Sequence, residues 1–379
     1  MRVVHIITGL GDGGAENILR KICEYDLDNK HIVISLQKPG KYSSLIKKMG
    51  IKVYHLNMKF FSILKFFKII RLLNFLKPDI VQTWLVLGDL IGGIAAKLSG
   101  IKSIIWNVRY SKLTLENTSL INILLSRILI VLSYMIPKVI IVGSKSAKRN
   151  CENQGYCKQK LILIVNGYEP SIFKSDLSKR VSFRKKFDIN NKVTVIGNVA
   201  RYDKVKDHSG LLKALSIINS NKINFVCVLV GSEIDKNNFT LVKQIKNYNL
   251  NNKIKLIGIH RDIIQVMNGI DIYVQSSKYG EGFPNVVAEA MACKTPCVVT
   301  DSGDAPFIVS KTGWIVPPNN PKKLAKSIMK AIFQKNTSKW DKKCKVSQSR
   351  IKKNFPLDKM INNYQKLWLI VHGQNTKKH

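Results

Sequence analysis

Acidic residues are scarce in this chain. Its 379 residues include 24 aspartates and glutamates against 62 lysines and arginines, which gives a formal net charge of +38. A surplus of this size predicts anionic partners, which can be nucleic acid, an anionic membrane surface or substrates that carry phosphate. Any proposed function therefore has to include an anion.

Paired cysteines are also missing. The seven cysteines are odd in number and form no C-x-x-C motif, and the closest neighbours, Cys151 with Cys157 and Cys293 with Cys297, lack the further ligands of a zinc site. No pair of acids has the spacing of a metal clamp, and the segment 26–28, which contains Asp26 and Asp28 at a helix end, is expected at the surface. We therefore expect reduced thiols, no disulfide framework and no metal.

No secretory signal is apparent either, because the first apolar run, 3–8, is short and is followed by glycines. The expected location is thus cytoplasmic. At this length, and with 45% hydrophobic residues, two or three globular domains are expected.

Strand-like and helix-like segments alternate along the chain, which favours doubly wound parallel sheets. A polar, basic stretch at 174–186 separates two such series. We therefore expect a first domain at 1–166, a linker at 167–189 and a second domain at 190–355. The expected strands are 3–8, 31–36, 51–56, 79–84, 103–109 and 138–143 in the first domain, and 193–201, 224–230, 254–258, 270–275 and 296–300 in the second.

The first strand runs into glycines spaced G-x-G-x-x-G, namely Gly9, Gly11 and Gly14. This spacing occurs in dinucleotide-binding domains, where an acid at the end of the second strand binds the ribose. Here that strand ends in Gln37-Lys38, which argues against a NAD enzyme. These glycines can therefore form either a ligand-binding loop or a turn that is needed only for close packing.

The most informative stretch is 279–292, which places a glycine loop and an alanine-rich helix between two strand-like runs. Proline suits the first helical position, because its missing N–H would have no intrahelical partner there. If Pro284 is that residue, the amides of 285–287 point out of the helix start. Such a terminus suits a phosphate.

Two carboxylates bracket this helix start, Glu281 in the loop and Glu289 eight positions later. A carboxylate beside a diphosphate would repel it, so the natural partners of both acids are hydroxyl groups. A diphosphate flanked by polyhydroxylated rings describes a nucleotide-sugar. The alternative is a structural helix start with two solvated acids.

Two bases follow the strand at 193–201. Arg201 ends the strand and Lys206 lies in the next loop, so both could reach one anion. By spacing alone, two bases in a lysine-rich chain mean little. His208 is interpreted as the first residue of a helix.

The string E-G-F-P-N-V-V-A-E-A-M-A-C at 281–293 resembles the donor-site signature of the retaining GT-B glycosyltransferases of family four, the glycosyl transferases of group 1. The resemblance covers most of the chain and is strongest at 193–318 and 1–20. It implies an α/β fold of two Rossmann-like, doubly wound parallel-sheet domains that face a central cleft. It also implies that a C-terminal helix at about 358–372 returns to the first domain.

The resemblance assigns roles to residues of this chain. Arg201 and Lys206 would hold the donor diphosphate and stabilise it as the leaving group, Glu281 would contact the sugar hydroxyls, and Glu289 would contact the ribose; the first three are the expected catalytic residues. The glycines after the first strand would face the donor phosphate and the acceptor. The expected donor-binding residues are Gly13, Gly14, Arg201, Lys206, Arg261, Glu281, Gly282, Phe283, Pro284, Asn285, Val286 and Glu289.

The chain departs from the family pattern in several places. Lys294 replaces a usual glycine and Phe307 a common glutamate. Relatives often carry a histidine in an acceptor-side loop, where this chain has Leu87 and Tyr110 at plausible positions. We therefore assign no catalytic histidine, and the resemblance implies transfer without a metal or other cofactor.

Two stretches of the first domain have the composition of membrane-contacting segments. Lys59–Lys77 holds five bases, five phenylalanines and no acid, as interfacial helices do, although only Lys65, Lys68 and Arg71 form one stripe. The alternative is a sheet-covering helix with a solvated basic edge. The apolar stretch 119–136 is interpreted as a helix against the sheet, with one apolar face open to lipid.

The sequence thus predicts a retaining hexosyl- or N-acetylhexosaminyl-type glycosyltransferase. Its donor would be a nucleotide-sugar, with UDP the commonest choice in the family, and its acceptor a glycan linked to undecaprenyl diphosphate. The reaction would serve bacterial surface polysaccharide or lipopolysaccharide assembly at the inner face of the plasma membrane. The alternatives are a nucleotide-sugar isomerase on the same fold and a basic nucleic-acid-binding protein, although the sequence has no nucleic-acid reader motif.

Overall fold

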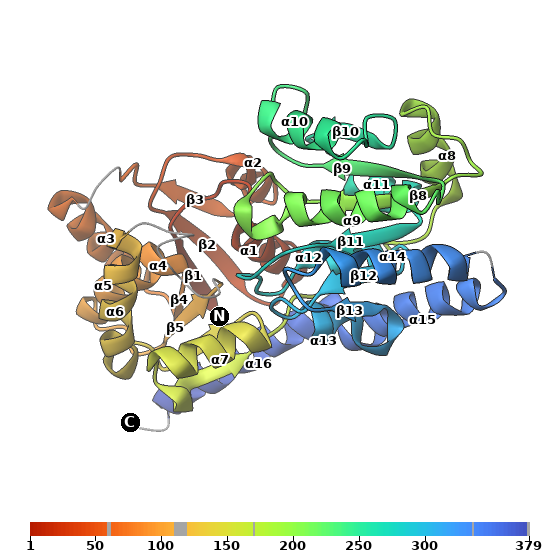
Figure 1. Ribbon diagram of the computed structural model, residues 1–379. Coiled ribbons are helices and arrows are strands. Elements are labelled where there is room, and N and C mark those ends of the chain that lie inside the picture. Colours follow the sequence, from red (N-terminus) through yellow and green to blue (C-terminus); the bar gives the residue numbers. More distant parts are fainter. Residues whose placement is uncertain (59–61, 110–119, 170, 336, 377–379) are drawn as a thin grey trace. The chain divides into compact units, whose positions relative to one another are not determined.

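A computed structural model describes residues 1–58, 62–109, 120–169, 171–335 and 337–376. The chain divides into two compact units (Figure 1). The N-terminal unit comprises Met1–Gly167 and the residues from Leu357 onward, and the C-terminal unit comprises Tyr168–Pro356. Each unit is built on its own sheet.

The N-terminal unit contains a seven-stranded parallel sheet in the order β3-β2-β1-β4-β5-β6-β7. The order reverses beside β1, as in a doubly wound fold. The strands are nearly continuous runs of apolar residues because helices cover both faces of the sheet. Their bounds are β1 Arg2–Ile7, β2 Lys30–Ser35, β3 Lys52–His55, β4 Ile80–Trp84, β5 Ile104–Val108, β6 Val139–Val142 and β7 Leu161–Leu163.

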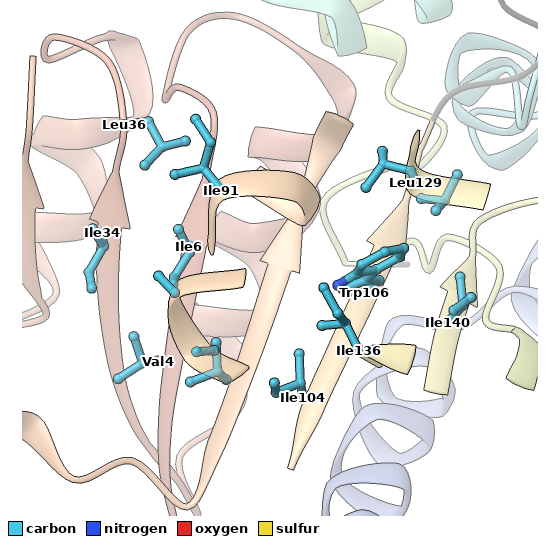
Figure 2. Packing of buried hydrophobic residues seen from close by; sticks show 14 of the residues in the cluster. Val4, Ile6, Ile34, Leu36, Ile91, Ile104, Trp106, Leu129, Ile136 and Ile140 are labelled. Atoms are coloured by element: carbon cyan, nitrogen blue, oxygen red, sulfur yellow. The ribbon is translucent and has the colours of Figure 1, made fainter. Parts of the chain in front are cut away.

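Separate apolar clusters line the two faces of this sheet. Figure 2 shows part of one cluster, in which Trp106 and Ile6 from the sheet pack with Leu129 and Ile136. The other cluster includes Tyr364 and Trp368. The helical segments are α1 Gly14–Tyr25, α2 Lys41–Lys48, α3 Ile63–Leu76, α4 Leu85–Leu87, the π-helical turn η1 Gly88–Gly92, α5 Gly93–Leu98, α6 Leu120–Met135, α7 Lys145–Gln154, η2 Lys158–Lys160 and α16 Leu357–Thr376.

Ser144 is the N-cap of helix α7, and its hydroxyl accepts a hydrogen bond from the Ala147 amide at 3.0 Å. One expectation for this unit is wrong. The sequence places the segment 26–28 at the surface, but Asp26 is buried, since its carboxylate accepts hydrogen bonds from His31 and Gln365. In the part of the chain that the structure describes, no helix is long and apolar enough to cross a membrane.

The C-terminal unit contains a six-stranded parallel sheet in the order β10-β9-β8-β11-β12-β13. Its order reverses beside β8, so both sheets are doubly wound, as the sequence predicts. The bounds are β8 Thr194–Val199, β9 Phe225–Val230, β10 Ile254–Gly258, β11 Ile272–Gln275, β12 Cys297–Thr300 and β13 Trp314–Val316.

The stretch expected as a linker at 167–189 contains α8 (Leu177–Lys186), which packs against α11 in the C-terminal unit. Arg180 and Arg184 of α8 bind the carboxylate of Asp271 at 2.6 and 2.8 Å. The remaining helical segments are η3 Lys204–Lys206, α9 His208–Ser220, α10 Phe239–Asn247, α11 Ile263–Gly269, α12 Asn285–Ala292, α13 Ala305–Val309, η4 Ser310–Thr312, α14 Pro321–Lys335 and α15 Lys339–Asn354.

Candidate donor-binding site

The candidate site lies at the carboxyl ends of β8 and β11, which are neighbours in the C-terminal sheet. Strand β8 leads to Arg201 and Lys206, and β11 leads to Glu281 and α12. The strand order reverses between these two strands, and open α/β sheets bind ligands at such a point. Residues 75 positions apart in the sequence therefore meet here.

An ion pair joins the two loops. The Lys206 ammonium donates to Glu281 Oε1 at 2.6 Å, and the Ser277 hydroxyl donates to the same oxygen at 2.5 Å. The Glu281 side chain is 9% exposed, whereas that of Lys206 is 25% exposed. The carboxylate is thus fixed by two donors, and the ammonium, with three N–H groups, can serve a further acceptor.

The loop after β12 packs against the backbone of Glu281 and Gly282. Gly303 has a φ of +60°, and a Cβ atom there would lie 2.2 Å from the Glu281 carbonyl oxygen. The Asp304 amide donates to the Gly282 carbonyl at 2.9 Å, and the Thr300 hydroxyl donates to the Ser277 carbonyl at 2.6 Å. Nothing in the sequence indicated the contact between Gly303 and Glu281.

Arg201 pairs with a different carboxylate. Its Nε and Nη2 atoms lie 3.0 and 2.9 Å from Asp203 Oδ2, and its side chain is 67% exposed. Burial alone would raise the pKa of Asp203, but the bonds from the Val205 amide and Arg201 and the charge of Lys206 hold it below its ordinary value. That Arg201 and Lys206 bind one anion stays a prediction.

Helix α12 begins one residue later than predicted. Pro284 is the N-cap, with φ −72° and ψ 97°, and Asn285 is the first helical residue. The Val287 amide donates to the Pro284 carbonyl at 3.1 Å, so it does not point out of the helix start as expected. The Val287 amide is used inside the helix because an i to i+3 hydrogen bond tightens the first turn.

Tyr168 fixes the start of α12, and sequence reasoning missed it. Its hydroxyl donates to Asn285 Oδ1 at 2.7 Å, and its ring stacks on Phe283 with centroids 6.2 Å apart. Burial, assisted by the charge of Glu289, raises the pKa of Tyr168 well above its ordinary value. Tyr168 therefore acts as a neutral hydrogen-bond donor that orients the Asn285 side chain.

Both acids of the motif, Glu281 and Glu289, affect the pKa of the buried Tyr273 side chain. Burial raises the pKa of Tyr273 well above its ordinary value, and nearby Cys297, Glu281 and Glu289 raise it further. The direct contacts predicted for Glu289 and Gly282 with a donor stay predictions.

The loop after β10 adjoins the loop after β9, because the Gly231 amide donates to the Gly258 carbonyl at 2.8 Å. Arg261 in this loop is exposed. His260 packs against the rings of Phe183 and Phe187, and burial followed by the charge of Lys186 lowers its pKa. An exposed arginine here can reach a ligand, and its donor contact stays a prediction.

In the N-terminal unit, Gly13 is the N-cap of α1 and Gly14 its first residue. A Cβ atom on Gly13 would lie 2.3 Å from a Glu16 carboxylate oxygen, so the flexible Glu16 side chain would have to shift for any other residue there. The expected contacts of Gly13 and Gly14 with the donor phosphate and acceptor stay predictions. Of the positions considered for a histidine, Leu87 ends α4 and Tyr110 lies outside the described residues.

Among the residues that the structure describes, one group could in principle hold a metal ion. It consists of buried His5, Cys23 and His31 in the N-terminal unit, whose ligand atoms lie within 4.8 Å of one another. The predicted donor residues, apart from the two glycines of α1, belong to the other unit.

Comparison with known proteins connects this geometry to a chemistry. Residues 179–347 match the model of the family described as glycosyl transferases group 1. The match lies within the C-terminal unit and contains Lys206, Glu281 and Glu289.

Three bacterial relatives are similar over different lengths. EpsF of Bacillus subtilis (strain 168) is 29% identical over 38% of this chain, which spans only 37% of that protein. The capsular polysaccharide biosynthesis glycosyltransferase CapM of Staphylococcus aureus is 28% identical over 70% of each chain. An Escherichia coli enzyme named UDP-Gal:alpha-D-GlcNAc-diphosphoundecaprenol alpha-1,3-galactosyltransferase is 22% identical over 79% of this chain and 77% of its own.

Solved structures show the same architecture. HepE of Anabaena, crystallised in complex with UDP, superimposes with a TM-score of 0.84 at 21% identity, over 97% of this chain and 99% of that one. Together with the two doubly wound sheets, this likeness shows that the chain has the GT-B fold. The family match and the relatives identify the chain as a glycosyltransferase that resembles the glycosyl transferases of group 1.

Proposed function

We propose that this protein transfers a hexosyl or N-acetylhexosaminyl group from a UDP-sugar to a hydroxyl group of a glycan linked to undecaprenyl diphosphate, with retention of the anomeric configuration. The observation that carries the proposal is the Lys206–Glu281 pair beside the first residue of α12. It puts a cation, a carboxylate and a helix start at one point of the sheet, as a diphosphate joined to a sugar requires.

Each group has a part in the reaction. Lys206 and Arg201 bind the diphosphate and stabilise the negative charge that develops on it as the sugar C1–O bond breaks. Glu281, already fixed by Lys206 and Ser277, accepts hydrogen bonds from sugar hydroxyls. The acceptor oxygen attacks C1 from the face that the diphosphate leaves, and its proton passes to the departing phosphate oxygen.

Two features support the donor and acceptor assignments. The E. coli relative is named for a UDP-sugar donor and a diphosphoundecaprenol acceptor, and HepE was crystallised with UDP. The net charge of +38 suits a substrate pair with two diphosphates at an anionic surface. The CapM relative, named for capsular polysaccharide biosynthesis, is consistent with surface glycan assembly.

The test is incubation of the purified protein with a panel of nucleotide-sugars and the lipid extract of a polysaccharide-producing bacterium, with products identified by mass spectrometry and their linkage by NMR. We expect release of UDP, a lipid mass raised by one sugar and an α linkage from an α donor. Activity should persist in EDTA, because Lys206 and Arg201 supply the positive charge. Product from donor alone would instead indicate an isomerase, and no consumption of any nucleotide-sugar would refute the proposal.

The N-terminal unit offers a surface for the membrane that holds such an acceptor. Helix α6 exposes a row of large apolar side chains on one face, while Leu129 on its other side is buried in the core. An exposed apolar face on a strongly basic protein suits an anionic lipid surface. The exposed residues of this face are Leu120 (70%), Leu124 (59%), Ile128 (42%), Val131 (64%), Tyr134 (58%) and Met135 (67%).

Helix α3, which packs against α5, adds basic and aromatic groups. Phe67 and Phe75 are 56% and 78% exposed, and Lys68 and Arg71 are exposed beside them. Lys59, predicted to begin this segment, lies outside the described residues. We propose that α3 and α6 place the enzyme peripherally at the cytoplasmic face of the plasma membrane.

Cosedimentation with vesicles tests this placement. We expect binding to vesicles that contain about one third phosphatidylglycerol and little binding to pure phosphatidylcholine. The double variant Leu124→Glu with Val131→Glu should lose binding. Leu177→Glu, at a 75% exposed leucine of α8, is the matched control and should bind as the wild type does. Equal binding of both variants would contradict the proposed surface.

A further inference from the structure

Arg109 follows β5 in the N-terminal unit, at the carboxyl ends of the adjacent strands β4, β5 and β6. Ligands of open parallel sheets bind at this edge, close to the point where the strand order reverses. Arg109 is partly exposed, and sequence reasoning assigned it no role.

Three side chains hold its guanidinium group. Nε donates to Asn107 Oδ1 at 2.7 Å, Nη1 donates to Asn166 Oδ1 at 2.6 Å, and Nη2 donates to the Tyr364 hydroxyl. Tyr364 is itself fixed, because it also accepts from Asn107 Nδ2 at 2.9 Å. These bonds use three of the five N–H donors of an arginine, so within the described residues one donor on each Nη atom is left for a ligand.

The surroundings fix the plane of the group further. The guanidinium carbon lies 5.8 Å from the ring centroid of Trp84, which in turn donates to His5 Nδ1 at 3.3 Å. A Cβ atom on Gly143 would lie 2.6 Å from Arg109 Nη1, so a side chain there would displace the guanidinium from its present position. Gly143 immediately precedes Ser144, the N-cap of α7, so a helix start with partial positive charge adjoins Arg109.

These three partners of Arg109 are all neutral. Some other arginines of this chain are paired with a carboxylate, as Arg184 is with Asp271 and Arg201 with Asp203. Within the described ranges no carboxylate forms an ion pair with Arg109. A guanidinium that is held by neutral partners and keeps one donor on each Nη atom can bind two oxygens of a phosphate.

We infer that Arg109 binds the diphosphate of the lipid-linked acceptor and thereby selects acceptors that carry one. This inference rests on the proposed function, because it assumes a diphosphate acceptor. Arg109 would not take part in bond breaking. It would set the affinity for the acceptor and hold its sugar hydroxyl in place.

The experiment compares two acceptors with the same sugar, one on undecaprenyl diphosphate and one on a neutral alkyl chain, the sugar being one that the wild-type enzyme uses. Arg109→Gln should raise KM for the diphosphate acceptor about 10- to 100-fold, which corresponds to one or two charge-assisted hydrogen bonds. Its KM for the alkyl acceptor and for the donor should stay within about twofold of wild type. A purely structural role would instead impair both acceptors equally, and that outcome or an unchanged KM overturns the inference.

Two further variants keep the test decisive. Arg109→Lys keeps the charge without the paired donors and should lie between wild type and Arg109→Gln, and it carries the test if the glutamine variant does not fold. Tyr364→Phe loosens the guanidinium and should raise only the diphosphate-acceptor KM, by a few fold. If the wild type uses neither acceptor or only the neutral one, the proposed acceptor fails and this inference with it; if it uses the diphosphate acceptor and Arg109→Gln does so equally well, this inference alone fails.

Discussion

His5 and His31, on the neighbouring strands β1 and β2, place Nε2 and Nδ1 3.0 Å apart in the buried centre of the N-terminal unit. Because Trp84 donates to His5 Nδ1, the His5 proton is assigned to Nε2, which donates to His31. His31 then donates through Nε2 to Asp26 Oδ2 at 3.0 Å. A metal on His5 Nε2 would move that proton to Nδ1, against the Trp84 N–H, so the histidines of the potential metal group form a hydrogen-bonded chain instead.

The first prediction concerns Asp26, the last member of this series of hydrogen bonds. Burial opposes the charge of Asp26, but the bonds from His31, Gln365 and Asn29 lower its pKa to about 2. Asp26→Asn replaces the charged acceptor and turns one oxygen into a donor, so it should lower the free energy of unfolding by about 1–3 kcal/mol. Denaturant titration measures this. The exposed neighbour Asp28→Asn is the control and should change stability by less than about 0.5 kcal/mol.

The second prediction concerns removal of the Lys206 ammonium group. Lys206→Met should lower kcat by about 10²–10³, because one well-aimed donor to the leaving group is removed. Lys204→Met is the matched control, since Lys204 lies in the same short turn η3 but is exposed and makes none of these contacts. It should keep kcat within about twofold. Steady-state release of UDP measures both, and equal rates for the two variants would remove Lys206 from the chemistry.

The loops that carry Lys206 and Glu281 could be recognised in the sequence because each of them follows a strand, but that these residues bind a donor stays a prediction. Strand ends are visible as apolar runs, so the carboxyl ends that carry Lys206 and Glu281 could be placed together from topology alone. Periodicity cannot resolve a single residue at a helix end, which is why the expected start at Pro284 was one position early.

Contacts between distant segments were not predictable in the same way. The Tyr168–Asn285 bond joins residues 117 positions apart, and nothing local distinguishes Tyr168 from other tyrosines. Asp26 looks like a solvated acid at a helix end until the neighbouring strand brings His31 beside it. The role inferred for Arg109 likewise depends on its contact with Tyr364, which lies on the C-terminal helix α16, far from Arg109 in the sequence.

The third prediction concerns the close approach of Gly303 to the Glu281 carbonyl. Gly303→Ala would put a Cβ atom 2.2 Å from the Glu281 carbonyl oxygen at a φ of +60°. The loop has to move, so both thermal stability and affinity for the UDP-sugar should fall. Gly100→Ala is the control, because Gly100 has a φ of +73° and a Cβ atom there would meet no described atom within 4 Å.

The two alanines separate backbone strain from displacement of the site. Gly100→Ala should cost only about 1–2 kcal/mol, the cost of a left-handed backbone for a non-glycine residue. Its donor affinity, measured by calorimetry with a UDP-sugar, should match that of the wild type. If Gly303→Ala also keeps its affinity, the loop after β12 does not position Glu281.

The fourth prediction concerns His208, the first residue of α9, whose ring nitrogens make no hydrogen bond within the described part of the chain. Burial, followed by the charge of Lys206 and opposed by Asp203, lowers its pKa to about 4. In the unfolded chain the pKa is about 6.5. The unfolded state therefore binds a proton more readily, so His208 makes the protein less stable as the pH falls below about 6.5, by roughly 1.4 kcal/mol per pH unit until about pH 4.

His208→Leu should remove this contribution. Between pH 7 and pH 5 the free energy of unfolding of the wild type should fall by about 2 kcal/mol more than that of the variant. His5, His55 and His260, whose pKa values burial also lowers, contribute equally in both proteins, so the difference isolates His208. At pH 7 the variant should be at least as stable, since leucine leaves no unpartnered nitrogen in the core. Denaturant midpoints at pH 5, 6 and 7 provide the measurement, and parallel pH profiles would show that His208 is protonated equally in the folded and unfolded chain.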